Sequence, residues 1–330
     1  MTRLLIFEPS FRLIEAELSA HGDRLTPVVL GADGGFTVDG AAIGADDVAA
    51  DAVWMSGDLY GNPAARDFFA ATLKSPDLKW VQSAAAGFDH PVFAQLVNKG
   101  ARLTTSHGQA IGMADYVLAG VLDHFQRGPE RRRAQAEGTW REAPFREILG
   151  STWLIVGFGA IGQAVARRAG AFGARIIGVR RNPDSHPLAD AIAAMEALPG
   201  LLPTADVVVL CAPLSPATRH MADARFFAAM KAGCVLVNVG RGALVDEAAL
   251  LAALEGDAPG HAVLDVFETE PLPADSPFWA HPKVSLSPHA SGVTGQQGGR
   301  NQALFLDNLA RFLAGEPLLH EIDPRDVLNG

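Results

Sequence analysis

Three segments in the C-terminal half of the chain carry side chains that could bind an anion and move a proton. Arg241 stands between two glycines at the end of an expected strand, residues 235–239, where its guanidinium can serve as an anion clamp. Residues 265–273 place carboxylates ahead of a rigid turn with two prolines, and His289 follows another expected strand, residues 283–286. Ligands of parallel α/β sheets bind at the carboxyl ends of the strands. Acid–base chemistry on a small anionic molecule is therefore expected there.

A glycine pattern earlier in the chain is typical of a dinucleotide-binding turn. The run Gly157-Phe158-Gly159-Ala160-Ile161-Gly162 follows an apolar segment and opens an expected helix, residues 160–171. Gly157 would form the tight turn, Gly159 would leave room for the pyrophosphate, and Gly162 would allow close helix–strand contact. The helix would direct unpaired N–H groups and a partial positive charge at the phosphates. Because the bare motif also occurs by chance, its position between strand and helix carries the prediction.

The end of the next expected strand, residues 175–179, indicates which dinucleotide is bound. An Asp or Glu there would accept hydrogen bonds from a free ribose 2′-hydroxyl. Here Arg180 and Arg181 follow the strand, and the nearest carboxylate, Asp184, lies beyond a proline. Each guanidinium can form charge-assisted bonds to a 2′-phosphate. We therefore expect NADP(H) over NAD(H); the alternative is that both arginines are solvated and either cofactor is accepted.

Alternating strand and helix patterns predict two doubly wound parallel sheets. Expected strands in the first sheet are residues 3–7, 51–54 and 78–82. Expected strands in the second are residues 152–156, 175–179, 207–210, 235–239 and 283–286. A last helical pattern, residues 301–313, has no strand of its own to cover and is expected to return to the first sheet.

The expected architecture is therefore α/β with two domains and a cleft between them. A discontinuous, flavodoxin-like substrate domain comprises residues 1–106 and 290–330, and a Rossmann dinucleotide-binding domain comprises residues 107–289.

Composition restricts partners and compartment. The 37 acidic and 27 basic residues give a net charge of −10, so the average surface field repels nucleic acid and anionic lipid. No apolar run approaches the roughly 20 residues of a membrane span. Cys211 and Cys234 lie in or beside apolar strand-like runs, where cysteine is usually a small buried hydrophobe. We expect a cytoplasmic protein that uses no metal and has no nucleic-acid or membrane partner.

Taken together, these segments resemble the family of D-isomer-specific 2-hydroxyacid dehydrogenases. The resemblance extends from Gln82 to the C-terminal helix and rests on motifs in the same order: Leu149-Gly150, the glycine motif, residues 213–218, residues 230–233 and residues 241–247. It implies a homodimer that transfers hydride between a nicotinamide cofactor and a small 2-oxo or D-2-hydroxy acid. The arginine pair resembles the glyoxylate and hydroxypyruvate reductase branch, which favours those two substrates by analogy.

The same resemblance implies that Arg241, Glu270 and His289 are the catalytic residues. A protonated His289 would neutralise charge on the carbonyl oxygen, Glu270 would orient the imidazole, and Arg241 would hold the carboxylate. Asp265 would face the nicotinamide carboxamide. Glu268 competes with Glu270 for the pairing role; the resemblance selects Glu270 and leaves Glu268 solvated. Four further positions are expected to contact the cofactor: Ala212, Pro213, Val239 and Gly240.

A run of small residues, 83–87, follows the expected strand 78–82 of the first domain. Small side chains there let backbone N–H groups approach a carboxylate without a basic side chain. The resemblance places the substrate carboxylate at Ala86 and Gly87, and Met55, at the end of an earlier strand, is a further expected substrate contact. The alternative is an ordinary strand-to-helix turn.

Two other functions are compatible with this fold. A formate-type dehydrogenase would, by resemblance, carry glutamine in place of Glu270. A corepressor-like dinucleotide sensor could keep Arg241, Glu270 and His289 without turnover, but no long partner-binding tail is present, so an enzyme is favoured. The roles of His220 and of Asp115, where the family more often has Glu, stay open.

Overall fold

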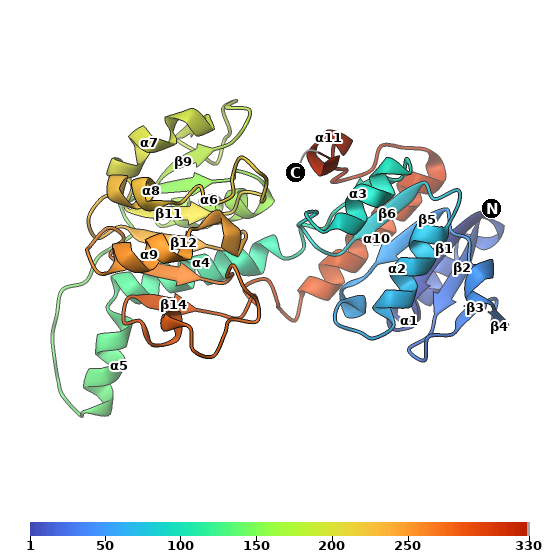
Figure 1. Cartoon of the computed structure of the whole chain (residues 1–330), viewed down its shortest axis with the longest axis horizontal. Helices are drawn as coiled ribbons and strands as arrows, with labels where there is room; N and C mark the ends of the chain where they lie inside the picture. The colour runs from blue at the N-terminus through green and yellow to red at the C-terminus, as the bar shows by residue number, and fades with distance from the viewer. Residues whose placement is uncertain (329–330) are drawn as a thin grey trace. The chain divides into compact units, whose positions relative to one another are not determined.

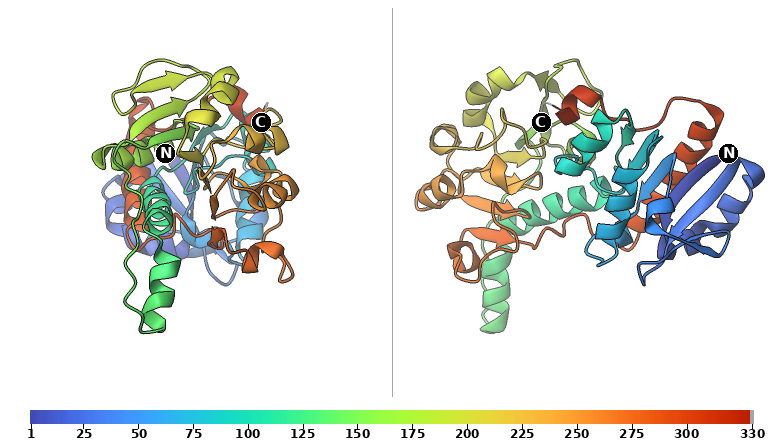
Figure 2. Two further views of the ribbon diagram at one scale, coloured as in Figure 1. Left: turned by 90° about the vertical axis from the view of Figure 1, so that its left-hand side faces the viewer. Right: turned by 45° about the vertical axis from the view of Figure 1, so that its right-hand side comes forward.

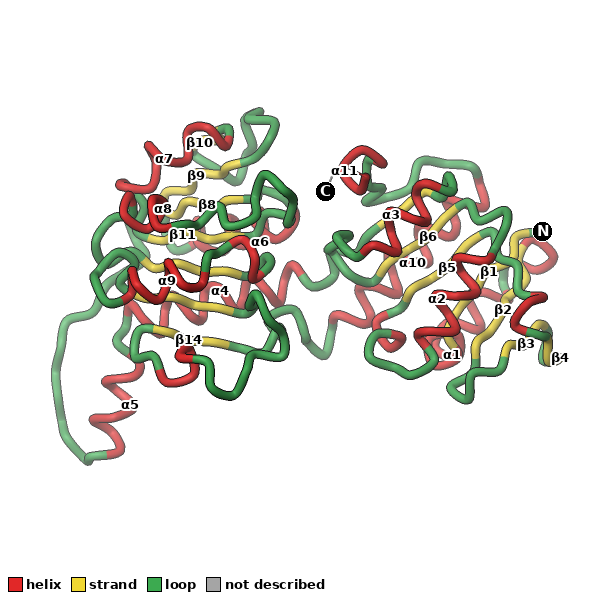
Figure 3. Tube along the Cα trace, viewed as in Figure 1, coloured by secondary structure: helices red, strands yellow, loops and turns green. Residues whose placement is uncertain are grey.

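The computed structural model describes residues 1–328 and divides into two compact units. Unit 1 comprises Met1–Gly108 together with the chain from Thr294 onward, and unit 2 comprises Gln109–Val293. Each unit is a seven-stranded sheet covered by helices on both faces (Figures 1 and 3). The expected fold class, two doubly wound α/β domains, is confirmed.

The sheet of unit 1 has the strand order β4-β3-β2-β1-β5-β6-β7. Its strands are β1 (Thr2–Phe7), β2 (Leu25–Leu30), β3 (Phe36–Val38), β4 (Ala41–Ile43), β5 (Ala52–Met55), β6 (Trp80–Ser83) and β7 (Arg102–Thr104). Strands β2, β1, β5, β6 and β7 are parallel, in the order of flavodoxin-like folds.

The expectation of a wholly parallel sheet is wrong at one edge of unit 1, because β2, β3 and β4 form an antiparallel meander. Asp39 and Gly40, with φ of 50° and 78°, make the two-residue turn between β3 and β4. An Asp-Gly pair between short apolar runs is a strong hairpin signal. This signal was available in the sequence.

Both faces of the unit 1 sheet are covered. Helices α1 (Glu8–Ser19) and α10 (Gln297–Ala314) cover one face, and α2 (Ala65–Lys74), α3 (Pro91–Asn98) and α11 (Pro324–Leu328) lie on the other. Helix α10 packs on the sheet through Phe305, whose ring stacks on Trp54 with centroids 4.2 Å apart and on Trp80 with centroids 5.8 Å apart. Burial of these aromatic rings explains why a helix encoded at the end of the chain belongs to the first sheet.

The sheet of unit 2 is wholly parallel in the order β10-β9-β8-β11-β12-β13-β14, which extends the Rossmann order by one strand. Its strands are β8 (Thr152–Val156), β9 (Arg175–Val179), β10 (Ala191–Ala193), β11 (Val207–Leu210), β12 (Val235–Asn238), β13 (His261–Leu264) and β14 (Val284–Leu286). The sequence pattern missed β13, because four residues that begin with a histidine are too short a signal.

The helices of unit 2 pack on alternate residues of the strands, as the two-residue repeat of a strand requires. Trp153 and Ile155 face α4 (Ala110–Phe125) and α6 (Ala160–Ala171). The intervening Leu154 and Val156 face the layer formed by α7 (Leu198–Leu201), α8 (Ala224–Ala229) and α9 (Glu247–Leu254). Helix α5 (Gly128–Ala136) and the loop after it project away from this sheet (Figures 1 and 2).

Short 3-10 turns complete the elements: Gly22–Arg24, Ala45–Asp47, Gly57–Leu59, Met195–Ala197, Leu202–Thr204, Gly242–Leu244 and Pro277–Ala280. Within residues 1–328, no helix is both long and apolar enough to cross a bilayer.

Candidate functional site

Glycine is required at each of the three positions of the motif after β8, but not for the same structural reason. A Cβ on Gly157, whose φ is +98°, would lie 2.4 Å from the backbone nitrogen of Ala212, and one on Gly162 would lie 2.4 Å from the carbonyl oxygen of Gly157. Neither position can take a larger residue without moving backbone. A Cβ on Gly159 would meet no protein atom within 4 Å. The middle glycine therefore faces open space, as the close approach of a phosphate requires.

Helix α6 begins directly after this turn. Gly159 is its N-cap, and no side chain caps the first turn, so N–H groups that have no partner within the helix point out of its start. The side chain of Phe158 is buried, with its ring against Gly178, and Ile161 packs on the core between sheet and helices. Only backbone is left to meet a ligand. These residues fit the phosphates of a dinucleotide.

Arg180 and Arg181 follow β9. Arg180 is half-buried, its Nη2 donates to the carbonyl oxygen of Asp184 at 2.7 Å, and its Nε–H is buried with no acceptor among the described residues. A buried donor without an acceptor is costly, and a phosphate oxygen would satisfy it. Arg181 is exposed.

The other expected cofactor contacts lie at the ends of the neighbouring strands. Ala212 is buried with its backbone against Gly157, and Pro213 after it is exposed. Val239 is buried, and a Cβ on Gly240 would lie 3.1 Å from the carbonyl oxygen of Ala212. Because β8, β11 and β12 are adjacent and parallel, these residues and the glycine turn share one edge of the sheet.

A buried asparagine that the sequence reasoning missed holds the segment carrying Arg241. The side chain of Asn238, 1% exposed, accepts from the Gly240 N–H at 3.1 Å and donates to the Arg241 carbonyl at 2.9 Å. The Arg241 Nη1 donates to the Gly240 carbonyl at 2.9 Å. A polar residue at the end of the apolar strand β12 was the available signal.

The structure pairs His289 with Glu270. Nδ1 of the imidazole lies 2.7 Å from Oε2 of the carboxylate, and Oε1 accepts from the Phe267 N–H at 2.9 Å. The His289 side chain is 51% exposed, and its backbone has a φ of +51°. Because the carboxylate holds Nδ1, Nε2 is the ring nitrogen that a substrate can reach.

Glu268 has different partners from Glu270. Its Oε1 accepts from the Glu247 N–H at 3.2 Å, and its Oε2 lies 3.4 Å from Nε2 of His220. Glu268 is exposed to solvent, and its carboxylate also contacts two other segments of unit 2, which the sequence did not indicate.

Asp265 holds the turn that carries His289. The carboxylate is 1% exposed; Oδ1 accepts from Ser287 Oγ at 2.5 Å, Ala290 N at 2.8 Å and Ser291 N at 3.0 Å, and Oδ2 accepts from Ser291 Oγ. The two serines were not singled out in the sequence. The expected contact between Asp265 and the nicotinamide stays a prediction.

In unit 1, the loop after β6 offers backbone donors. Ser83 Oγ accepts from the Ala85 N–H at 3.1 Å and is hydrogen-bonded to the Tyr60 hydroxyl at 3.1 Å. The N–H groups of Ala86 and Gly87 have no acceptor in the part of the chain that the structure describes. Such a pair of donors suits a carboxylate.

Met55 was expected to contact the substrate, but the structure places its side chain elsewhere. It is fully buried in the core between the sheet and α2 and α3, and its carbonyl accepts from the Ala84 N–H at 2.9 Å. The Met55 side chain is therefore a core residue that no substrate can reach here, and only its carbonyl contacts the loop after β6.

Asp115, another residue of open role, lies on α4. Its Oδ1 accepts from Nε of Arg168 on α6 at 2.6 Å, so it joins two helices that cover the same face of the sheet.

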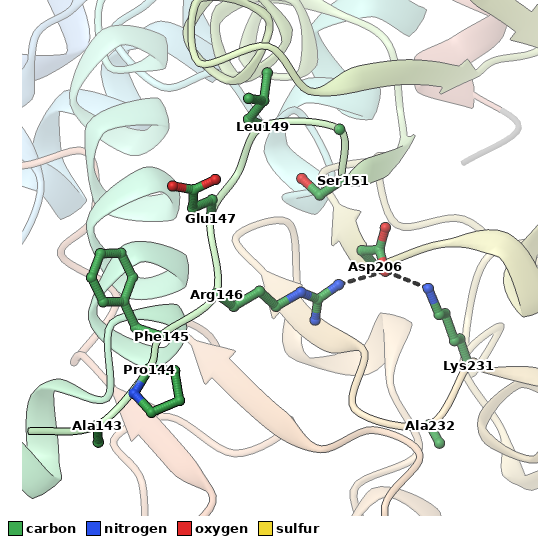
Figure 4. Close-up of a pocket in the computed structure, with 11 residues that line it drawn as sticks. Ala143, Pro144, Phe145, Arg146, Glu147, Leu149, Ser151, Asp206, Lys231 and Ala232 are labelled. Atoms are coloured by element: carbon green, nitrogen blue, oxygen red, sulfur yellow. Dashed lines mark hydrogen bonds and ion pairs between the residues drawn. The ribbon is translucent and has the colours of Figure 1, made fainter.

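A cavity of about 860 Å³ in unit 2 lies at the opposite edge of the sheet (Figure 4). Arg146 and Lys231 both contact Oδ1 of Asp206, at 2.5 and 2.6 Å. The Asp206 pKa is lowered: burial raises it, but the bonds from Lys231 and the Thr152 N–H and the charge of Arg146 outweigh burial. Asp206 precedes β11, whereas the glycine turn follows β8, so this cavity is not the cofactor site.

Comparisons with known proteins agree on one family of dehydrogenases. Residues 118–291 match the family model described as the NAD binding domain of D-isomer specific 2-hydroxyacid dehydrogenases. The chain is 37% identical to (S)-sulfolactate dehydrogenase of Chromohalobacter salexigens over 72% of its length and 78% of the relative. It is 34% identical to glyoxylate reductase of Korarchaeum cryptofilum over 78% of its length and 79% of the relative.

A solved structure extends the likeness to almost the whole chain. The NADPH-dependent glyoxylate/hydroxypyruvate reductase of Sinorhizobium meliloti, in complex with NADP and sulfate, superposes with a TM-score of 0.76 at 27% identity. The match covers 98% of this chain and 99% of that one. Both units therefore have counterparts in a solved enzyme.

Proposed function

The chain belongs to the D-isomer specific 2-hydroxyacid dehydrogenase family, and on that premise we propose that it reduces small 2-oxo acids to D-2-hydroxy acids with NADPH. An NAD(P)-dependent oxidoreductase is what its named relatives support. The observation that carries the finer proposal is the His289–Glu270 pair, 2.7 Å apart, in the unit that holds the glycine turn.

The three proposed catalytic residues have separate tasks. A nicotinamide cofactor bound at the glycine turn would supply the hydride, so these residues must accommodate negative charge on the carbonyl oxygen of the substrate. Nε2 of His289 donates the proton that neutralises this charge, while Glu270 holds Nδ1 and so fixes the ring. Arg241 binds the substrate carboxylate through its guanidinium. In the reverse direction His289 accepts the proton from the hydroxy acid.

Unit 1 contributes backbone donors to substrate binding. The N–H groups of Ala86 and Gly87, which have no acceptor among the described residues, bind the carboxylate. Ser83 supports them by fixing the Ala85 N–H. No side-chain charge is needed for this contact.

The proposed preference for NADPH rests on Arg180 and Arg181. The buried Nε–H of Arg180, which lacks an acceptor among the described residues, gains one from a 2′-phosphate. The Sinorhizobium meliloti relative, whose structure holds NADP, also supports a preference for NADPH.

We also propose that the enzyme is a cytoplasmic homodimer. Trp140 and Phe145, on the loop after α5 that projects from unit 2, are 92% and 49% exposed, which favours burial against a second copy. Cys211 and Cys234 are free thiols, and burial raises the pKa of each to about 12, in keeping with a reducing compartment. Sedimentation equilibrium at micromolar concentration tests the dimer, and a monomeric mass would contradict it.

The experiment that tests the function is NADPH oxidation with glyoxylate, hydroxypyruvate, pyruvate, phenylpyruvate and 3-sulfopyruvate. The last is the 2-oxo acid of the sulfolactate that the Chromohalobacter relative is named for. We expect turnover with glyoxylate and hydroxypyruvate, and a decrease in kcat of about 1,000-fold in His289→Ala with NADPH binding unchanged.

Three results would overturn parts of this proposal. A His289→Ala enzyme within tenfold of wild type would remove the acid–base role. KM values for NADPH and NADH within about threefold of each other would remove the NADPH preference. Cofactor binding without turnover on any of the five acids would favour a dinucleotide sensor instead.

A further inference from the structure

Two segments of unit 2, residues 241–247 and 265–270, are joined by contacts that the proposed reaction does not use. Their backbones touch at Gly242, where a Cβ would lie 1.9 Å from the carbonyl carbon of Phe267. The first segment begins with Arg241, and the second ends with the partner of His289. The relative placement of the anion clamp and the acid–base pair therefore depends on this junction.

Two glutamates hold the junction by exchanging backbone hydrogen bonds. The Glu268 N–H donates to Oε1 of Glu247 at 2.7 Å, and the Glu247 N–H donates to Oε1 of Glu268 at 3.2 Å. Such close carboxylates repel each other. Burial, followed by the charges of Glu268 and Glu270, raises the pKa of Glu247 in spite of the backbone bond.

His220 packs against this pair. Its Nε2 is buried and has no hydrogen-bond partner among the described residues, and Oε2 of Glu268, 3.4 Å away, is close enough to be its partner after a small shift. Its backbone has a φ of +51°, and its N–H donates to the Ala243 carbonyl at 2.8 Å, which ties it to the segment that carries Arg241. A left-handed backbone at a residue other than glycine is costly, and it persists here at a three-segment contact.

We propose that His220, Glu247 and Glu268, called the clasp from here on, are positioning residues that set Arg241 against the His289–Glu270 pair. In this proposal the clasp acts through the backbone of the two segments that it joins. Glu270 takes part in the same junction, since its Oε1 accepts from the Phe267 N–H. This inference rests on the proposed function, because it concerns the placement of Arg241 in that reaction.

The first test compares Glu268→Ala with Glu255→Ala. Glu255 is an exposed glutamate at the C-cap of α9, outside the clasp. We expect Glu268→Ala to raise the KM for glyoxylate about tenfold, with the KM for NADPH within about twofold of wild type, because only the anion clamp is displaced. Glu268→Gln keeps the oxygen that accepts from Glu247 and should recover most of the loss. Glu255→Ala should match wild type.

The second test measures the coupling of His220 to Glu268. His220→Asn keeps a residue that tolerates a positive φ and removes the imidazole Nε2. We expect its KM for glyoxylate to rise about threefold in the wild-type background and not at all in the Glu268→Gln background, since coupled residues are not additive. If His220→Asn raised the KM for glyoxylate by the same factor in both backgrounds, the pairing of His220 with Glu268 would be overturned. This test does not use Glu268→Ala, so it stays decisive if that variant fails to fold.

A binding measurement separates failure of the clasp from failure of the proposed function. Oxamate, an amide analogue of a 2-oxo acid that does not accept hydride, is titrated into the NADPH-loaded protein by calorimetry, so turnover is not required. We expect about tenfold weaker oxamate binding in Glu268→Ala. Equal oxamate affinity in Glu268→Ala and Glu255→Ala, or an equal loss of oxamate and NADPH affinity in Glu268→Ala, would overturn the clasp.

Discussion

The proposed ligand contacts of the two units come from different kinds of segment. In unit 2, the strand ends carry three glycines, an arginine, a glutamate and a histidine, whose types are visible in the sequence. In unit 1, the loop after β6 offers the N–H groups of Ala86 and Gly87, which any residue except proline could supply. The two sheets differ because the glycine turn and the ionisable side chains of unit 2 require particular residue types, whereas the loop of unit 1 is marked in the sequence only by small side chains.

Substitutions at Gly157 and Gly159 should give the largest effect on cofactor binding and divide the glycine motif into two roles. Both changes to alanine are expected to weaken NADPH binding about 100-fold, equivalent to about 2.7 kcal/mol. Only Gly157→Ala should also lower the thermal midpoint, because its Cβ meets the Ala212 backbone whereas the Cβ at Gly159 meets no protein atom. Fluorescence titration and calorimetry check both points. An equal loss of stability in the two variants would contradict this division.

Arg180→Ser should separate the two cofactors in unit 2. A charge-assisted hydrogen bond to the 2′-phosphate contributes roughly 2 kcal/mol of binding free energy. Its loss is expected to raise the KM for NADPH about 30-fold, while the KM for NADH stays within about twofold of wild type. Arg181→Ser, a change at the exposed neighbour, is expected to have the smaller effect on the KM for NADPH. If Arg180→Ser changed both cofactors equally, its role in recognising the phosphate would be refuted.

A histidine in each unit, half-buried His107 in unit 1 and buried His261 in unit 2, should make both units sensitive to acid. Burial and His320 lower the pKa of His107 in unit 1 to about 4, and burial and His124 lower that of His261 in unit 2 to about 4. Between pH 6.5 and 4 the unfolded chain binds these protons and the folded chain does not, so stability present above pH 6.5 is lost as the pH falls.

His261→Gln should therefore flatten the pH dependence of unit 2. The loss attributable to His261 is on the order of 2 kcal/mol after allowance for screening by solvent. Scanning calorimetry at pH 7.5 and 5.0 compares wild type with His261→Gln and, for unit 1, with His107→Gln. Variants that lose as much stability as wild type between these pH values would show that other groups dominate.

Tyr60→Phe should give the smallest effect and addresses unit 1 alone. Its hydroxyl is bonded to Ser83 Oγ, which in turn fixes the Ala85 N–H beside the proposed carboxylate donors. Losing one partly exposed hydrogen bond of about 0.5 to 1 kcal/mol is expected to raise the KM for glyoxylate about threefold, with the KM for NADPH unchanged. If Tyr60→Phe changed the KM for NADPH more than the KM for glyoxylate, Tyr60 would not act through the substrate-binding loop after β6.

The glycine motif and the strand ends of unit 2 were predictable because their chemistry needs particular residue types. No other residue has the freedom of glycine at Gly157, and an anion clamp and an acid–base group must be ionisable side chains. The choice of Glu270 over Glu268 came from family resemblance; the residue pattern left it open. Strands β2 and β13 were not predicted, because β2 contains a proline, β13 is four residues long and begins with a histidine, and such short runs give a weak periodic pattern.

The sequence by itself determined the fold class, the dinucleotide turn and the ionisable residues that could act on a substrate. Only the tertiary structure decided which residues meet: that Asn238 brackets Arg241, that Asp265 holds the His289 turn, that Met55 is core, and that His220 reaches Glu268. The physical reason is that residue type fixes what a group can do, whereas its partners are set by how β12, β13 and the loops after them pack. Packing of segments distant in sequence leaves no local pattern.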